Sequence, residues 1–264
     1  MRRKAILIGV LLLASCSSPT GVPADVRSAL APTGTLRAAI NFGNPILATR
    51  DPDTGEPRGL SVDLSRELAR RLEVPVQLVT YEAAGRVVAD VKADAWDVGF
   101  VAIDPARAVD IGFTAPYVVI EGAYLVPGDS PIRSNDEVDR EGVRVMVGNG
   151  SAYDLFLMRT LQRATLVRAQ TSPAVVDTMV AQQVEVAAGV RQQLEADARR
   201  IGGLRLLDGR FMVIEQAMAV PKGREAGEAY VRAFVEEMKA SGFVAAALER
   251  HGIEGVSVGP PAAP

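Results

Sequence analysis

Few residues of this chain have the type and spacing of a reactive or ligand-binding group. Gly148, Gly150 and Ser151 directly precede a segment whose apolar spacing predicts a helix. The N–H groups at the start of such a helix can receive an anion, and Ser151 can cap the helix while also donating a hydrogen bond. The alternative is that Ser151 serves only as an N-cap. The loop therefore indicates a possible anion site, with both roles open for Ser151.

Composition excludes several other kinds of site. The chain has 264 residues with one Cys and one His, too few for a Cys/His metal cluster or an internal disulfide. Its 29 Lys and Arg residues face 32 Asp and Glu residues, and a formal net charge of -3 lacks the basic character of a nucleic-acid binder. The sequence also has no Gly-rich phosphate loop, nucleophile elbow or paired metal ligands. We therefore expect no cofactor, no metal and no nucleic-acid partner.

The N-terminus has the pattern of an export signal. Three basic residues precede the apolar run Ala5–Ala14, which is too short to span a bilayer and is typical of a signal peptide. Residues 13–16 resemble a bacterial lipobox, which predicts a lipoprotein signal peptide over 1–15 and lipidation of Cys16. A free Cys in an ordinary signal peptide is the alternative. The mature chain would carry a charge of about -6, and Ser/Pro-rich residues 16–33 are expected to form a flexible tether.

The body of the chain alternates between strand and helix patterns. Leu60, Leu64, Leu68 and Leu72 recur every four residues, which predicts an amphipathic helix. The alternation implies an α/β fold in which helices flank a mainly parallel sheet. It occurs twice, and residues 88–99 resemble residues 176–187, a weak sign of two similar lobes. The predicted strands are 36–41, 74–81, 97–103, 143–148, 166–169 and 184–189, and the predicted helices are 60–72, 87–91, 152–161, 173–182, 191–200, 225–240 and 243–251.

Six short motifs resemble those of the family 3 extracellular solute-binding proteins of ABC transporters, in the order and spacing of that family. The resemblance covers about Gly34 to Ile253. Each motif alone is weak, but several in register are specific. The motifs are Gly59–Leu64, Trp96–Val98, Ile103–Arg107, Phe113–Tyr117, Val147–Tyr153 and Ala219–Gly223.

The resemblance implies a type 2 periplasmic binding protein, in which two hinged lobes close on a solute and present it to a membrane permease. Such a protein would act as a monomer in the periplasm or at the cell surface, anchored by the lipid on Cys16. The implied divisions are lobe 1 at 34–117 plus 217–253, lobe 2 at 122–210, hinge strands at 118–121 and 211–216, and a loose tail at 254–264.

The resemblance also assigns a binding role to Arg107, because amino-acid binders of the family grip the ligand carboxylate with this arginine. A guanidinium offers two parallel donors to a carboxylate. The alternative is a surface arginine paired with Asp104 or Asp110. The other expected cleft residues are Asn41, Phe42, Asn44, Phe100, Ala102, Gly150, Ser151, Ala152, Val190 and Arg191.

One departure from the family pattern bears on the ligand. Amino-acid binders carry an Asp for the ligand ammonium where this chain has Val190, and a buried ammonium without an acid partner is costly. We therefore expect a carboxylate-bearing solute, amino acid or organic acid, with a neutral or apolar remainder. Arg191 either receives a second acid group or is a solvated helix residue, and Phe42 and Phe100 either form an apolar wall or belong to the core.

Two other functions remain open on the sequence alone. Cyclohexadienyl dehydratases share the fold, and such an enzyme would need a poised acid or histidine. Glu121 and Glu215 are the candidate acids, although both are more typical of hinge or surface groups, and His251 lies far from every motif. The third possibility is a sensory solute-binding lipoprotein. The binding protein remains the expected function, and we expect no enzymatic activity.

Overall fold

The computed structural model describes residues 21–263, and its regular elements follow the predicted alternation. The predicted signal peptide and Cys16 lie outside these residues. The helices are α1 (Ala24–Leu30), α2 (Leu60–Leu72), α3 (Ala84–Ala89), α4 (Ala152–Thr160), α5 (Val175–Ala181), α6 (Arg191–Ile201), α7 (Glu225–Ala240) and α8 (Phe243–Arg250). The strands are β1 (Leu36–Asn41), β2 (Thr49–Arg50), β3 (Pro57–Arg58), β4 (Val76–Tyr81), β5 (Val98–Ala102), β6 (Ile111–Phe113), β7 (Val118–Pro127), β8 (Arg144–Gly148), β9 (Thr165–Ala169), β10 (Val186–Val190), β11 (Leu204–Leu206), β12 (Met212–Pro221) and β13 (Ser257–Val258).

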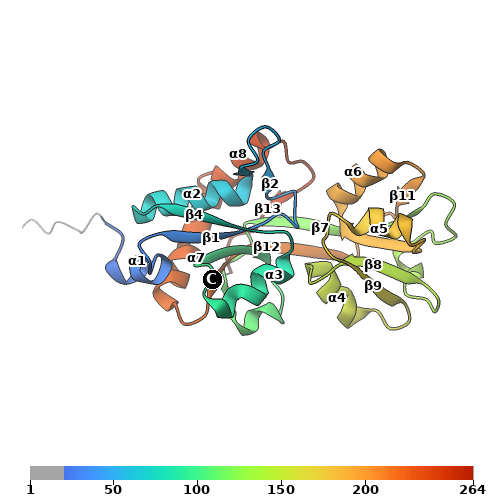
Figure 1. Ribbon diagram of the computed structural model, residues 1–264, viewed down its shortest axis with the longest axis horizontal. Helices are drawn as coiled ribbons and strands as arrows, with labels where there is room; N and C mark the ends of the chain where they lie inside the picture. The colour runs from blue at the N-terminus through green and yellow to red at the C-terminus, as the bar shows by residue number, and fades with distance from the viewer. Residues whose placement is uncertain (1–20, 264) are drawn as a thin grey trace, which may run out of the picture.

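The main sheet runs through two lobes that lie side by side (Figure 1). Its strand order is β4-β1-β5-β12-β7-β10-β8-β9, so the two ten-residue strands β7 and β12 form its middle. Strands β1, β4 and β5 are parallel in one lobe, and β8, β9 and β10 are parallel in the other. Strands β7 and β12 pair antiparallel with each other and with their outer neighbours. The predicted α/β fold with two lobes is confirmed.

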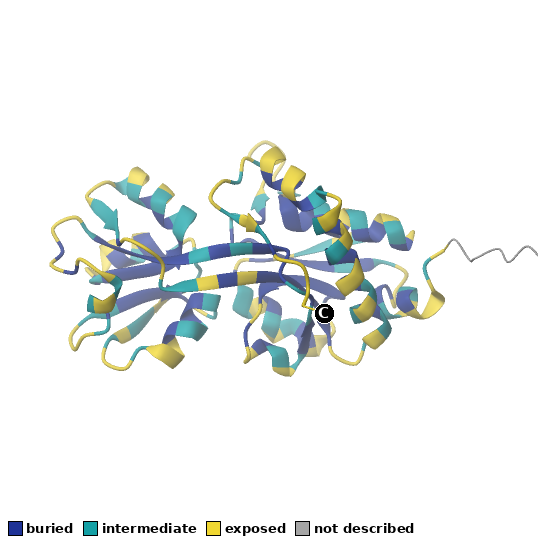
Figure 2. Cartoon of the chain, turned by 180° about the vertical axis from the view of Figure 1, so that it is seen from behind, coloured by how far each residue is buried: buried dark blue, intermediate teal, exposed yellow. Residues whose placement is uncertain are grey.

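The leucine spacing explains how α2 covers the sheet. Leu60, Leu64, Leu68 and Leu72 are fully buried, because a period of four residues keeps them on one face of the helix. The helix ends at Glu73, which adopts a left-handed conformation, two residues before Pro75. Most residues of β7 and β12 are likewise buried (Figure 2), and one cluster of buried apolar residues includes members of both lobes.

The internal resemblance corresponds to a repeated ion pair. At the start of β1, the backbone N–H and guanidinium of Arg37 donate to the carboxylate of Asp97. At the start of β8, the backbone N–H and guanidinium of Arg144 donate to Glu185 in the same way. Both acids follow a helix and a left-handed residue and stand just before a parallel strand. The lobes therefore share local structure as well as topology.

Two segments expected to be loose are ordered. Residues 24–30, inside the expected tether, form α1, which packs on α7 and buries Val26 and Leu30. The expected tail is also ordered in part, because β13 pairs with β7 and the N–H of Gly259 donates to the carbonyl of Tyr117. The tether prediction is wrong for α1 and the tail prediction is wrong for residues 257–259, since neither segment has an apolar run long enough to reveal its packing. Over residues 21–263, no helix has the length and apolar character needed to cross a bilayer.

Candidate functional site

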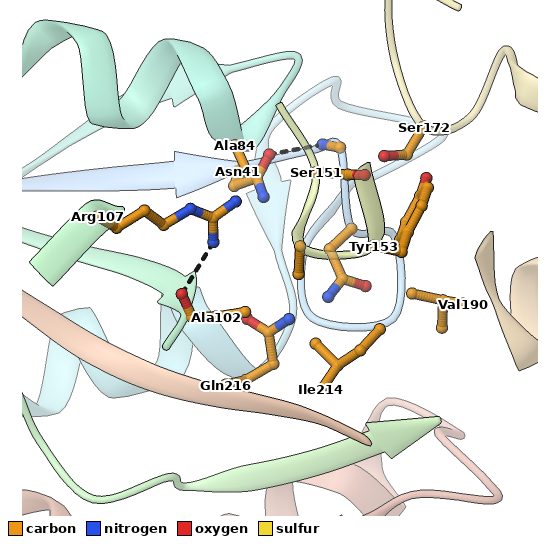
Figure 3. A pocket seen from close by; sticks show the side chains of 13 residues that line it. Asn41, Ala84, Ala102, Arg107, Ser151, Tyr153, Ser172, Val190, Ile214 and Gln216 are labelled. Atoms are coloured by element: carbon orange, nitrogen blue, oxygen red, sulfur yellow. Dashed lines mark hydrogen bonds between the residues drawn. The ribbon is translucent and has the colours of Figure 1, made fainter. Parts of the chain in front are cut away.

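A small cavity lies between the lobes, beside strand β12 where it pairs with β7 (Figure 3). Lobe 1 contributes the ends of β1 and β5, lobe 2 contributes the start of α4, and β12 forms one wall. Its volume of about 30 Å³ leaves room for little more than two water molecules, so the two lobes are drawn together around it. The lining residues are Asn41, Gly43, Asn44, Ala84, Ala102, Arg107, Ser151, Ala152, Tyr153, Ser172, Val190, Ile214 and Gln216.

Arg107 is the one charged side chain among these lining residues. It is only 3% exposed, and its Nη1 donates to the carbonyl of Ala102 at 2.9 Å. Its Nη2 donates to the carbonyl of Gly150, in the other lobe, at 2.9 Å. Buried Nε has no partner among the described residues. Burial lowers the pKa of Arg107 to about 10, which still leaves it a cation at neutral pH with N–H groups available to an anion.

The alternative of a surface arginine is wrong. Arg107 is buried and forms no salt bridge with Asp104 or Asp110 within the part of the chain that the structure describes; Asp104 instead pairs with Arg159, and Asp110 with Lys92. A tight turn holds Arg107 in place, since its backbone N–H donates to the carbonyl of Asp104 at 3.1 Å.

Ser151 caps α4, as one of its two expected roles requires. Its Oγ accepts the N–H of Asp154 at 3.0 Å, and the carboxylate of Asp154 accepts the N–H of Gly150 at 2.9 Å. The Ser151 hydroxyl keeps a proton to donate, and the first-turn N–H groups of Ala152 and Tyr153 have no partner within the helix. This end of α4 therefore offers several neutral donors to an anion opposite Arg107.

No lining residue is acidic. The polar lining consists of hydroxyls and of the carboxamides of Asn41, Asn44 and Gln216. The Oδ1 of Asn41 accepts the N–H of Gly43 at 2.9 Å, whereas the buried Oδ1 of Asn44 has no partner in the described structure. Burial raises the pKa of Tyr153, so its hydroxyl remains neutral. The cavity is therefore a positively charged site with neutral polar walls.

Seven of the expected site residues line this cavity, and an eighth, Gly150, supplies the carbonyl that Arg107 contacts. The seven are Asn41, Asn44, Ala102, Arg107, Ser151, Ala152 and Val190.

Three expected site residues lie outside the cavity. Phe100 is buried in the core with its ring edge against Tyr117, and Phe42 packs in the same core beneath Arg50. Arg191 pairs with Glu121, Nε to Oε2 at 2.9 Å, and is not a lining residue. Of the two alternatives for Phe42 and Phe100, the structure therefore has core packing and not an apolar cavity wall, and Arg191 forms an ion pair in place of a second anion contact.

The sequence reasoning missed most of the β12 wall. Ile214 and Gln216 point toward the cavity from this strand, and Tyr153 and Ser172 complete the lobe 2 side (Figure 3). Gln216 could have been predicted from the sequence, because it is a polar residue directly before the apolar run 217–220; in the structure it is 6% exposed. The others lack a distinctive pattern. Gly43 and Ala84 were missed as well.

The candidate catalytic groups do not reach the cavity. Glu121 pairs with Arg210 and Arg191, which lower the pKa of its carboxyl and keep it ionised. Glu215 is exposed, and Nε2 of His251 lies 2.8 Å from a carboxylate oxygen of Asp63. Within residues 21–263 no group of His, Cys, Asp and Glu side chains has the arrangement of a metal site. The arrangement of the cavity fits capture of an anion.

A family model described as bacterial extracellular solute-binding proteins, family 3, matches residues 36–254. The match covers most of the chain. The chain belongs to this family. The resemblance indicated by the six motifs is confirmed, and membership of the family accounts for the two-lobe fold of the chain. No match was found among curated proteins.

Solved structures of amino-acid-binding proteins have the same fold as this family 3 protein. The solute receptor for L-cysteine of Neisseria gonorrhoeae aligns with a TM-score of 0.75 and 23% identity, over 87% of this chain and 95% of that one. A mutant of ArgBP from T. maritima aligns with a TM-score of 0.73 and 19% identity, over 85% of this chain and 98% of that one. An ancestral amino-acid-binding protein, described as a precursor of cyclohexadienyl dehydratase, aligns with a TM-score of 0.71 and 20% identity, over 85% of this chain and 98% of that one.

Proposed function

We propose that this protein captures a small carboxylate-bearing solute between its lobes and delivers it to the permease of an ABC transporter. The observation that carries the proposal is Arg107, a buried cation with one orphaned N–H, facing the capped start of α4 across the cavity. A carboxylate placed there receives charge-assisted hydrogen bonds from lobe 1 and neutral donors from lobe 2. Because it contacts both lobes, the solute favours the closed arrangement.

The residues that line the cavity limit the class of solute that it can bind. Relatives of the same fold are described as binding arginine, lysine or cysteine, all of which carry an α-ammonium group. An ammonium in this cavity would meet Arg107 and no lining acid, since Val190 stands at the position where amino-acid binders carry an aspartate. We therefore infer a monocarboxylate whose remainder is neutral, with hydrogen-bonding groups that suit the carboxamides of Asn44 and Gln216.

The domain division belongs to this proposal. Residues 34–117 plus 217–253 would form one lobe and 122–210 the other, and closure would turn about segments 118–121 and 211–216. These segments are neighbours, since Val118 pairs with Gln216 and Glu121 with Val213. Two adjacent strands can absorb a rotation without loss of their mutual hydrogen bonds, which is what a hinge requires.

Calorimetric titration of the mature chain with propionate, lactate and alanine tests the site. We expect propionate or lactate to bind and the variant Arg107→Met to lose at least tenfold in affinity, because a hydrogen bond to a charged group contributes about 1.5–3 kcal/mol. Arg200→Met is the matched control, since that arginine pairs with Asp177 and Asp197 within its own lobe, and it should bind as the wild type does. Undiminished binding by Arg107→Met would refute the proposal.

Membrane attachment is the remaining element of the proposal. A diacylated Cys16 would anchor the protein to a bacterial membrane, facing the periplasm or the cell surface, where a permease can receive the closed form. Incorporation of labelled palmitate in a bacterial host tests this, with Cys16→Ser as the variant that should lose the label. Labelling of the serine variant would contradict it.

A further inference from the structure

We propose that Asp104 and Arg159 form an interlobe latch that positions Arg107 and stabilises the closed arrangement. The inference rests on the proposed function, since it describes how the same cleft closes. Neither residue lines the cavity, and neither has a role in the proposed solute contacts. Both are therefore positioning residues.

The latch is a two-bond ion pair across the cleft. Nη2 of Arg159 donates to Oδ2 of Asp104 at 2.7 Å, and Nη1 donates to Oδ1 at 3.3 Å. The Asp104 side chain is 5% exposed and the Arg159 side chain 42%. Among residues 21–263, this pair is the one salt bridge that joins a residue of 34–117 or 217–253 to a residue of 122–210; Arg191 and Arg210 pair instead with hinge residue Glu121.

Each partner belongs to an element that carries part of the site. Oδ1 of Asp104 accepts the N–H of Ala106 at 2.8 Å, and its carbonyl accepts the N–H of Arg107, so Asp104 shapes the turn that presents the guanidinium. Arg159 lies in the last turn of α4, whose first turn begins at Ser151 beside the cavity. A cation there also suits the negative end of the helix dipole.

The backbone beside the latch shows how closely the lobes meet. A Cβ built on Gly150 would lie 2.9 Å from the Cα of Gly85 in the other lobe, so the two backbones touch where a larger residue would hold them apart. Arg107 crosses the same gap to the carbonyl of Gly150. The ion pair thus reinforces a contact surface that exists only when the lobes are together.

The size of the effect follows from competition with water. When the lobes separate, both charges regain hydration, so the pair contributes less than its Coulomb energy, and the exposure of Arg159 weakens it further. The bidentate geometry and the burial of Asp104 act in the opposite direction. We expect loss of the latch to weaken solute affinity about three- to thirtyfold, mainly through faster dissociation.

The variant Arg159→Gln in the mature chain tests the latch, with Arg200→Gln as the matched control. Arg200 is a half-exposed lobe 2 arginine whose partners, Asp177 and Asp197, lie in its own lobe. We expect Arg159→Gln to enlarge the radius of gyration measured by X-ray scattering and to speed propionate dissociation, while Arg200→Gln matches the wild type. A double-mutant cycle with Asp104→Asn, which keeps an acceptor oxygen for Ala106, should give a coupling of at least threefold in affinity.

The outcomes separate the two proposals. If the wild type binds none of propionate, lactate and alanine, the proposed function fails, and the scattering comparison still tests the latch. If the wild type binds propionate but Arg159→Gln leaves the radius of gyration and the dissociation rate unchanged, the latch is refuted and the proposed function stands. A cycle in which the two substitutions add independently also refutes it.

Discussion

Replacing Val190 by Asp should convert this cavity from one that prefers a simple carboxylate to one that accepts an amino acid. Val190 is 9% exposed, lines the cavity and occupies the N-cap of α6 with backbone angles in the extended region. Aspartate suits that backbone position and can accept a helix N–H, so folding should be retained. The substitution therefore changes the charge of the cavity wall without a large cost in stability.

The magnitude follows from the contacts that the new carboxylate can make. A hydrogen bond between it and a ligand ammonium should contribute about 1.5–3 kcal/mol, which raises the affinity for alanine relative to that for propionate about 10- to 150-fold. Propionate has the same carbon skeleton without the ammonium. The carboxylates of both ligands, about 6 Å from the new charge at an effective dielectric constant of about 20, are repelled by about 3 kcal/mol, so this repulsion cancels in the comparison of the two ligands. The Val190→Asp variant should therefore bind alanine more tightly than propionate.

Calorimetric titration of the wild type and both variants with alanine and propionate measures this. Val190→Asn is the control, because it offers the same cap and nearly the same volume without the charge, and it should leave the preference of the wild type in place. Equal binding of alanine and propionate by the wild type would refute the reasoning. So would a Val190→Asp variant that leaves the ratio of the two affinities unchanged.

Three further changes probe closure and the fold. Gly150→Ala should weaken propionate binding in calorimetry at least tenfold, because Gly150 has a φ of 68° and its Cβ would lie 2.9 Å from the Cα of Gly85. Gly85→Ala should weaken binding less, because the nearest atom to its Cβ is 3.3 Å away; equal losses would contradict this. Arg70 and Arg71 lower the pKa of Glu67 from 4.5 to about 2, so its stabilisation is complete above pH 4.5 and is lost as the pH falls through 2. In denaturant titrations, Glu67→Gln should lower the free energy of unfolding by about 1–2 kcal/mol at pH 7, and the difference should disappear below pH 2. Leu30 is fully buried against α7, so Leu30→Ala should lower the free energy of unfolding by about 2–4 kcal/mol in the same assay. An unchanged midpoint of unfolding would mean that α1 does not contribute to the folded core.

Much of the fold was predictable because local patterns and tertiary packing agree. The leucines of α2 and the apolar runs of β1, β5 and β8 have the period that their burial demands, so their positions came close to the observed bounds. The helix α1 was missed because its seven residues bury only Val26 and Leu30 among small and polar neighbours. The order of residues 257–259 comes from a strand pairing with β7, and such a pairing leaves no local signal.

The candidate site was predictable to the extent that its residues lie in motifs. Arg107 and Ser151 were found because a turn motif and a glycine loop mark them. Phe100 has the chemistry of a pocket wall, yet its position in the middle of β5 places it in the core, and only Ala102, at the end of the strand, reaches the cavity. Residue type alone does not distinguish these two places on one strand.

The sequence by itself determined the alternation of strands and helices, the family and the identity of the one cation at the site, since each depends on residue types at fixed local spacing. The tertiary structure alone decided which groups meet across the cleft: Arg107 with the carbonyl of Gly150, and Asp104 with Arg159. These contacts join residues that are about 40 or more positions apart, and their distances depend on how two lobes are oriented about β7 and β12. No local pattern encodes that orientation, because it results from the packing of the whole core.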